Sequence, residues 1–219
     1  MTKFLDLHTH EPYPARNAYR IINLDLGKTP AHQPEGQFSC GIHPWYADQA
    51  SPDRFKHLEQ LAALPQAKMI GECGLDKLRG PSLAVQIAVL EKQVRLAEEL
   101  RKPLLLHCVR AFSELIEIKN RLKISVPAII HGFNKKTELA AQLEAHGFLL
   151  SVGAAVCRSG SGAARYAATA TGPFFLETDD AGQEIAAVYK AVADLRKISV
   201  EALKDLIFAH WKKYSLIDV

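Results

Sequence analysis

Histidines and carboxylates recur along this chain at positions that suit metal coordination. His8 and His10 are two residues apart, so in an extended strand their side chains point to the same side. Glu72 lies between Gly71 and Cys73 in an apolar run, where a carboxylate needs a cation to offset its desolvation. The predicted ligands are His8, His10, Glu72, His107, His131 and Asp179. Imidazole and carboxylate ligands without thiolate suit Zn²⁺, Mn²⁺, Mg²⁺ or Fe²⁺.

This ligand set is larger than one tetrahedral ion requires, which favours two divalent ions bridged by a carboxylate. Such pairs sit roughly 3.5–4 Å apart and lower the pKa of a bound water, which becomes the nucleophile of a hydrolysis. We therefore expect a metal-dependent hydrolase.

Short apolar runs alternate with amphipathic helical patterns around these residues. The expected strands are Lys3–Leu7, Arg20–Leu24, Phe38–Ile42, Met69–Cys73, Leu104–Cys108, Ala128–His131, Phe148–Val152 and Phe174–Thr178. The expected helices are Pro52–Leu64, Leu83–Leu100, Ala111–Leu122, Lys136–His146, Gly162–Ala170, Glu184–Leu195 and Val200–Tyr214. Eight such strands predict an α/β fold, a (β/α)₈ TIM barrel, with the ligands at the carboxyl ends of the strands, where barrel enzymes build their sites.

Two connections lack a helical pattern. The proline-containing segments Glu11–Tyr19 and Asp25–Gln37 predict a barrel without the outer helices after strands 1 and 2. Within Leu83–Leu100, the expected buried side is made of apolar residues. They are Val85, Ala88, Val89, Leu96 and Leu100.

Length and composition indicate one globular domain over residues 1–219. The net charge of +3 permits a polyanionic ligand without demonstrating one. The four cysteines are scattered, as in proteins of a reducing compartment. The first ten residues do not resemble a signal peptide, and no apolar run suits a membrane span. We expect a cytoplasmic protein without a membrane segment or an obligate protein partner.

Six strings occur in the order found in one known family. They are LDLHTH, CGIHPW, IGECGLD, PLLLHCVRA, IIHGF and LETDD. Over nearly the whole chain, this set resembles the TatD-type metal-dependent deoxyribonucleases. The resemblance implies a TIM-barrel hydrolase that acts on DNA phosphodiesters.

The resemblance also implies roles for individual residues. His8, His10, Glu72 and Asp179 would hold one ion, and Glu72, His107 and His131 the other. Glu72 and Asp179 are then the catalytic residues, because Asp179 would also orient the attacking water and take its proton. His43 would approach the scissile phosphate as a substrate contact.

The chain departs from the family pattern at three strand ends. Val109 stands where the family has arginine, and Arg110 is displaced by one position. The segment Gly132–Lys135 replaces Cys-Phe-Ser-Gly, and Asp179–Gly182 replaces Asp-Ala-Pro-Tyr. These departures affect expected substrate contacts rather than metal ligands.

Several assignments stay open at this stage. Asp180 competes with Asp179, and Asp6 is either a partner of the ligands or a strand-start acid. Trp45 and Tyr46 either stack on a base or cover the barrel where helices are missing. Basic loop residues are expected to bind phosphate, with a solvated charged rim as the alternative. This group is Lys77, Arg79, Arg110, Lys135, Lys136 and Arg158, and Lys77 and Arg110 are the expected substrate contacts within it.

Two other functions compete with a deoxyribonuclease. The same metal frame can hydrolyse an ester, amide or phosphate of a small molecule. A non-catalytic binding barrel is the third hypothesis. Because Glu72 stands on strand 4, the chain does not follow the pattern of amidohydrolases that carry a carboxylated lysine there.

Overall fold

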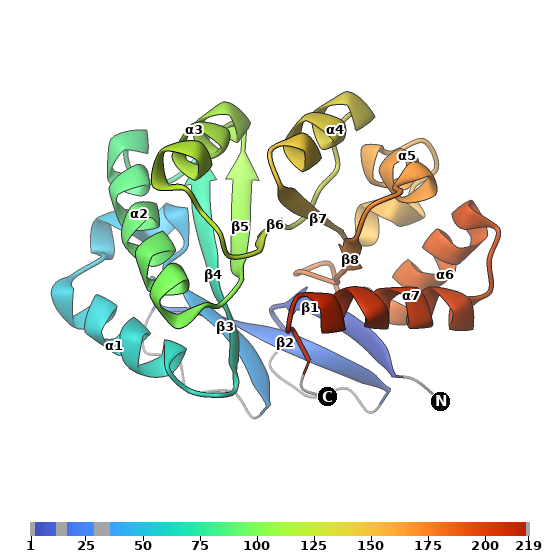
Figure 1. The fold of residues 1–219 in the computed structure, drawn as a ribbon, viewed down its shortest axis with the longest axis horizontal. Coiled ribbons are helices and arrows are strands. Elements are labelled where there is room, and N and C mark those ends of the chain that lie inside the picture. The colour runs from blue at the N-terminus through green and yellow to red at the C-terminus, as the bar shows by residue number, and fades with distance from the viewer. Residues whose placement is uncertain (1–2, 12–16, 29–35, 218–219) are drawn as a thin grey trace. The chain divides into compact units, whose positions relative to one another are not determined.

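The structure is a computed structural model that describes residues 3–11, 17–28 and 36–217 (Figure 1). The chain divides into two compact units, here called unit 1 (residues 1–21 and 131–219) and unit 2 (residues 22–130). Unit 1 contains both ends of the chain and unit 2 its middle. The single domain expected over residues 1–219 stays a prediction.

All eight predicted strands are present, and they form one sheet in chain order. They are β1 (Phe4–Thr9), β2 (Ala18–Asp25), β3 (Gln37–Gly41), β4 (Ala67–Asp76), β5 (Leu104–Val109), β6 (Ala128–Ile130), β7 (Phe148–Val152) and β8 (Phe174–Leu176). The pairs β3–β4, β4–β5, β5–β6 and β7–β8 are parallel. A parallel bridge between Thr9 and Asp179 returns the chain beyond β8 to β1. This order is that of the predicted barrel.

All seven predicted helices are also present. They are α1 (Pro52–Ala62), α2 (Leu83–Leu100), α3 (Phe112–Leu122), α4 (Thr137–Ala145), α5 (Gly162–Thr169), α6 (Ile185–Arg196) and α7 (Val200–Lys213). Two short 3₁₀ helices, η1 (Pro44–Gln49) and η2 (Ala154–Cys157), are too short to produce a helical period and were not predicted. Among the described residues, no helix lies between β1 and β2, as expected, and none is long and apolar enough to cross a membrane. Residues 29–35, between β2 and β3, lie outside the described residues, so the lack of a helix there stays a prediction.

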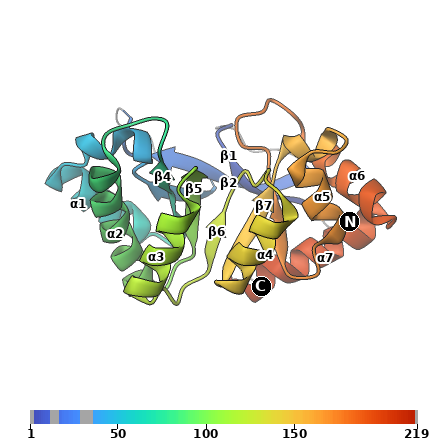
Figure 2. The ribbon, with the colours of Figure 1, turned by 90° about the horizontal axis from the view of Figure 1, so that it is seen from above.

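In unit 2, α1, α2 and α3 pack on β3, β4 and β5. Figure 2 shows α2 and α3 running alongside β4 and β5. The predicted buried side of α2 was wrong at Val85, which is 37% exposed, and at Ala88, which is also exposed. The buried residues of this helix are Gln86, Val89, Leu90, Gln93, Val94 and Ala97. Two glutamines therefore occupy the buried face, and an apolar period cannot reveal them.

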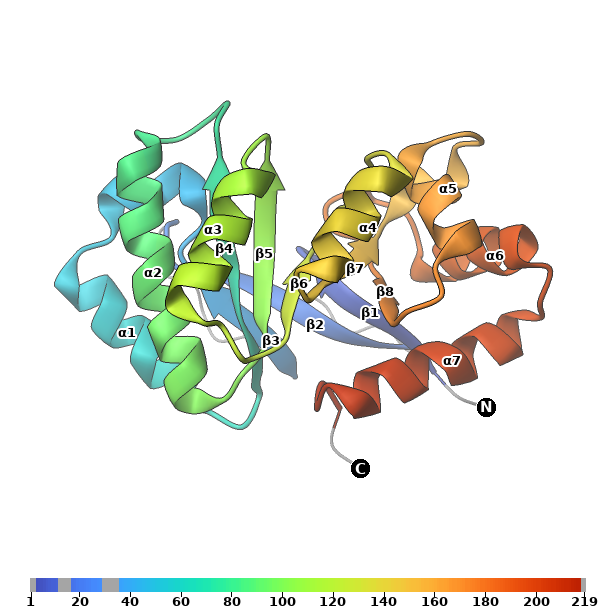
Figure 3. The same cartoon turned by 45° about the horizontal axis from the view of Figure 1, so that its top comes forward.

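In unit 1, α6 and α7 pack on β1 and β8, and α4 packs on β7 and α5 (Figure 3). Tyr189 of α6 is fully buried, and its hydroxyl contacts both backbone groups of Leu5 in β1. It accepts a hydrogen bond from the Leu5 amide at 3.2 Å and donates one to the Leu5 carbonyl at 3.1 Å. The helix thereby fixes the strand that carries His8 and leads into His10.

Gly74 lets β4 approach β5 at the level of His107, its partner in the strand register. Its φ is +143°, and an added Cβ would lie 2.0 Å from the His107 carbonyl oxygen. Gly74→Ala is therefore expected to lower the free energy of unfolding by at least about 2 kcal/mol. Gly172→Ala is the matched control, because nothing lies within 4 Å of its Cβ position. Urea titrations of both variants test this, and equal midpoints would refute it.

Candidate metal-binding sites

Unit 2 brings together two histidines and a glutamate from three neighbouring strands. His43 follows β3, Glu72 lies in β4 and His107 in β5. Glu72 Oε1 lies 2.8 Å from His107 Nδ1 and 3.1 Å from His43 Nε2. One ligand atom from each of the three residues lies within 4.8 Å of the others. These side chains are at most 14% exposed, so their charges are poorly solvated.

Asp76, at the end of β4, adds a second carboxylate that the sequence did not single out. Its Oδ2 accepts a hydrogen bond from Trp45 Nε1 at 2.6 Å and lies 3.4 Å from His107 Nε2. Burial raises the pKa of Asp76, but hydrogen bonds from Trp45 and Leu78 outweigh this effect and hold the pKa below its usual value. A carboxylate on Nε2 fixes the His107 ring and leaves Nδ1, which faces Glu72, as the nitrogen that could bind a metal ion.

His43 has the opposite hydrogen-bond pattern. The backbone N–H of Trp45 donates to His43 Nδ1 at 3.2 Å, which places the proton of the neutral ring on Nε2, toward Glu72. Burial lowers the pKa of His43, although the neighbouring Glu72 opposes the shift. A metal takes a nitrogen lone pair rather than an N–H group. The arrangement therefore suits the substrate contact predicted for His43 better than metal ligation.

Two buried glutamines of α2 hold the strand ends that carry this cluster. Gln93 accepts a hydrogen bond from the Ile42 amide at 2.8 Å and donates to the Ile42 carbonyl at 3.1 Å, one residue before His43. Gln86, two turns earlier, accepts from the Asp76 amide at 2.8 Å and donates to its carbonyl at 2.9 Å. The helix thus fixes the backbone at the ends of both β3 and β4.

Gln93→Ala is expected to lower the free energy of unfolding by about 3 kcal/mol, because it leaves the buried amide and carbonyl of Ile42 without their partners. Gln60→Ala, on the exposed face of α1, should stay within about 0.5 kcal/mol of the parent. Chemical denaturation of the three proteins measures both effects. A Gln93→Ala protein as stable as the Gln60→Ala control would show that these hydrogen bonds are not needed.

Unit 1 contains a second cluster around Asp179. Its Oδ1 lies 3.3 Å from His8 Nε2 and 3.5 Å from His10 Nε2. The rings of His8 and His131 are 4.7 Å apart, and His8, His131 and Asp179 have ligand atoms within 4.8 Å of one another. Burial raises the pKa of Asp179, but hydrogen bonds from His10 and His8 outweigh it and hold this carboxyl ionised. Asp179, and not the exposed Asp180, therefore lies with the histidines.

Neighbouring acids hold the loop after β8 in place. Asp6 accepts hydrogen bonds from the amide and hydroxyl of Thr178 at 2.9 and 2.8 Å, so it supports the loop. The Asp179 amide donates to the His8 carbonyl at 2.9 Å. Glu177 Oε1 accepts from the Gly132 amide at 2.6 Å and lies 3.7 Å from His131 Nδ1.

The donor atoms of both clusters suit a divalent cation. Each cluster offers imidazole nitrogens and a carboxylate oxygen at short mutual distances, and no cysteine belongs to any such group in the part of the chain described. In unit 1, Glu177 Oε2 is buried and has no hydrogen-bond partner among the described residues. A cation or an ordered water nearby would offset the cost of this burial.

The expected substrate contacts have different surroundings. Lys77 forms an ion pair with Glu114 of α3, with Nζ 2.5 Å from Oε1. Arg110 is exposed directly after β5, where its φ is +55°. The Arg79 guanidinium lies 4.8 Å from the ring centroid of Trp45, so this indole is held between a cation and Asp76. Contact of Lys77 and Arg110 with a substrate stays a prediction.

Comparisons with known proteins agree with this arrangement. The family model described as TatD related DNase matches residues 27–214. A protein from Citrobacter rodentium named 3'-5' ssDNA/RNA exonuclease TatD is 30% identical over 128 residues, which cover 58% of this chain and 49% of the relative. Its counterpart from Erwinia tasmaniensis is 36% identical over 122 residues, which cover 54% and 47%. The chain spans about half the length of the curated relatives it matches.

Solved structures show the same fold. The crystal structure of YJJV, a TatD homologue from Escherichia coli, has a TM-score of 0.82 at 22% identity and covers 100% of this chain and 99% of the other. A TatD family hydrolase from Entamoeba histolytica has a TM-score of 0.77 at 14% identity, with 97% and 98% covered. The predicted α/β barrel of eight parallel strands is thereby confirmed.

Proposed function

The chain belongs to the TatD related DNase family, and we propose that it is a divalent-metal-dependent nuclease that hydrolyses phosphodiester bonds of single-stranded DNA or RNA. The observation that carries the proposal is a cluster of imidazoles and a carboxylate in each unit, buried or half-buried. The relatives named as single-strand exonucleases support the nucleic-acid substrate. A cytoplasmic location stays a prediction.

We place one divalent ion at each cluster. In unit 2, Glu72 and His107 would hold it, and Asp76 would orient His107. In unit 1, His8, His131 and Asp179 would be the ligands, with His10 beside them. When bound, such ions lower the pKa of a water molecule and stabilise negative charge on phosphate oxygens. The division of the ligands between two ions and the identity of the metal stay predictions.

The protein groups contribute position and charge. Asp179, held ionised by its two histidines, is suited to orient the attacking water. Glu72 places its Oε1 3.1 Å from Nε2 of His43 and 2.8 Å from Nδ1 of His107. The Nε2–H of His43 is available for donation to a phosphate oxygen when the substrate displaces its contact with Glu72.

Cleavage of end-labelled strands tests the proposal. Protein stripped with a chelator is incubated with single-stranded DNA, RNA and duplex DNA, with Mg²⁺, Mn²⁺ or Zn²⁺ added in turn. Metal-dependent cleavage that Glu72→Ala abolishes is the expected result, and the ladder separates trimming from the 3' end from internal cuts. No cleavage by a metal-loaded protein would overturn the nuclease proposal and lead to tests on small phosphate esters.

A further inference from the structure

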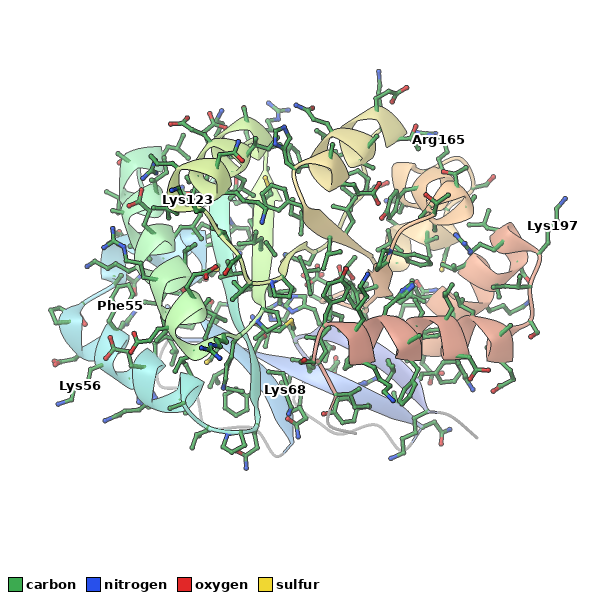
Figure 4. The ribbon with its side chains drawn as sticks, in the orientation of Figure 1. Phe55, Lys56, Lys68, Lys123, Arg165 and Lys197 are labelled. Atoms are coloured by element: carbon green, nitrogen blue, oxygen red, sulfur yellow. The ribbon has the colours of Figure 1, made fainter. Side chains whose placement is uncertain are left out.

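A cavity of about 420 Å³ lies in unit 1 beside the loop that follows His131. It is lined by Asn134, Lys135, Lys136, Leu139, Gly162 and Arg165. The lining contains three cations and no carboxylate. In Figure 4, Arg165 lies on the side of α5 near α4, and these two helices pack against each other.

Close backbone packing forms this cavity. A Cβ on Gly162, the first residue of α5, would lie 2.3 Å from the Lys135 carbonyl oxygen, so only glycine allows this approach. Asn134 Oδ1 accepts a hydrogen bond from the Ala163 amide at 3.1 Å, which ties the loop to the helix. Nδ2 of this side chain donates to none of the described residues and adds a donor group beside the cations.

The three cations have no acidic partner within the described ranges. Neither Lys135, Lys136 nor Arg165 forms an ion pair there. A single guanidinium nitrogen of Arg165 donates to the Gly160 carbonyl, which holds the side chain and leaves its other donors available. A groove along α1 and α2 in unit 2 differs, because Glu59 and Glu99 line it together with its cations. Of these two, only the cavity in unit 1 is lined by cations without a carboxylate.

We propose that this cavity binds a backbone phosphate of the single-stranded nucleic acid substrate, at a distance from the bond that is cleaved. The inference rests on the proposed nuclease function. Lys135 follows His131 by four residues, so the two are at most about 14 Å apart. If the scissile bond of a nucleic-acid strand lies beside His131, a phosphate a few nucleotides from that bond can therefore reach the cavity.

Two of the residues concerned lie where the chain departs from the family pattern that it resembles. Asn134 and Lys135 stand in the segment that departs from the Cys-Phe-Ser-Gly of the family pattern. A site that uses them therefore adds to the ligand set common to the family. A free phosphate ion has the same chemistry as a backbone phosphate, and competition can separate the two.

Strand binding without cleavage tests the proposal. Fluorescence anisotropy with a labelled 12-nucleotide DNA strand, in chelator and at several salt concentrations, compares the parent with the triple variant Lys135→Gln, Lys136→Gln and Arg165→Gln. We expect the triple variant to bind the strand at least about tenfold more weakly at low salt. The slope of its log K against log salt should be smaller by about 0.7 for each phosphate that it no longer binds. A dinucleotide is too short to reach the cavity, so its binding should not change.

The matched control removes the same charge elsewhere in unit 1. Lys197→Gln, Lys212→Gln and Lys213→Gln change exposed lysines, and Figure 4 shows Lys197 on the turn after α6, apart from Arg165. Equal losses in both triple variants, or no binding by the parent, would overturn the inference. So would binding of inorganic phosphate that the triple variant loses but that leaves strand binding to the parent unchanged, because the cavity would then be a site for free phosphate.

The outcomes for the cavity and for catalysis are separable, because this assay contains no metal. If the parent cleaves with metal and the triple variant binds the strand as tightly as the parent does, the role of the cavity is wrong and the nuclease function stands. If strand binding depends on the cavity but the parent cleaves no substrate with any ion, the nuclease function is wrong and the role of the cavity stands.

Discussion

Glu72→Gln is expected to reduce the metal-dependent cleavage rate by at least about 10³-fold. The Glu72 side chain is 4% exposed, and Oε1 lies within 3.1 Å of both His107 and His43, so the amide replaces a buried charge with little change of shape. Loss of a charged ligand removes several kcal/mol of electrostatic stabilisation, and each 1.36 kcal/mol corresponds to a factor of ten in rate. Single-turnover cleavage of a labelled strand measures the effect.

A structural readout accompanies this measurement. Addition of a divalent ion at about 100 times its Kd should stabilise the parent protein by about 2.7 kcal/mol per site that binds only the folded state. Glu72→Gln should lose part of that stabilisation, seen as a smaller rise in Tm. Glu59→Gln, an exposed change of the same type on α1, should behave as the parent does. Retention of more than a tenth of the parent rate by Glu72→Gln would contradict a role in metal binding.

The strands were predictable because their chemistry is local. The apolar runs and the polar residues directly after them correspond to strand ends, and each run forms a strand in the structure. The bounds differ where polar residues extend a strand. β4 continues to Asp76, while β8 ends at Leu176, before Glu177 and Thr178.

The groups that support the clusters were not predictable from periodicity. Gln86 and Gln93 are buried because they bond backbone groups of other elements, and such partners are distant in the sequence. Asp76 and Glu177 were missed for the same reason, although both stand in the strings IGECGLD and LETDD that carried the family resemblance. An acid in a string already predicted to contain ligands is the signal that would have identified them.

The contrast between Asp179 and Asp180 gives the sharpest test of the second cluster. Asp179→Asn is expected to lower the cleavage rate by about 10²–10³-fold, because its Oδ1 is the oxygen that contacts both His8 and His10. The Asp179 backbone is fixed by its hydrogen bond to the His8 carbonyl, so the amide side chain stays in place and only the charge is removed. The left-handed φ of +54° at this residue also favours asparagine among the replacements.

Asp180→Asn removes the same charge one residue away, on an exposed side chain, and should leave the rate within about threefold of the parent. Metal content, measured by mass spectrometry after dialysis, separates the two clusters. If each unit binds its own ion, Asp179→Asn and Glu72→Gln should each lose one equivalent, and the double variant both. Equal loss of activity in Asp179→Asn and Asp180→Asn would instead indicate that the loop's total charge matters, and the ligand role of Asp179 would be wrong.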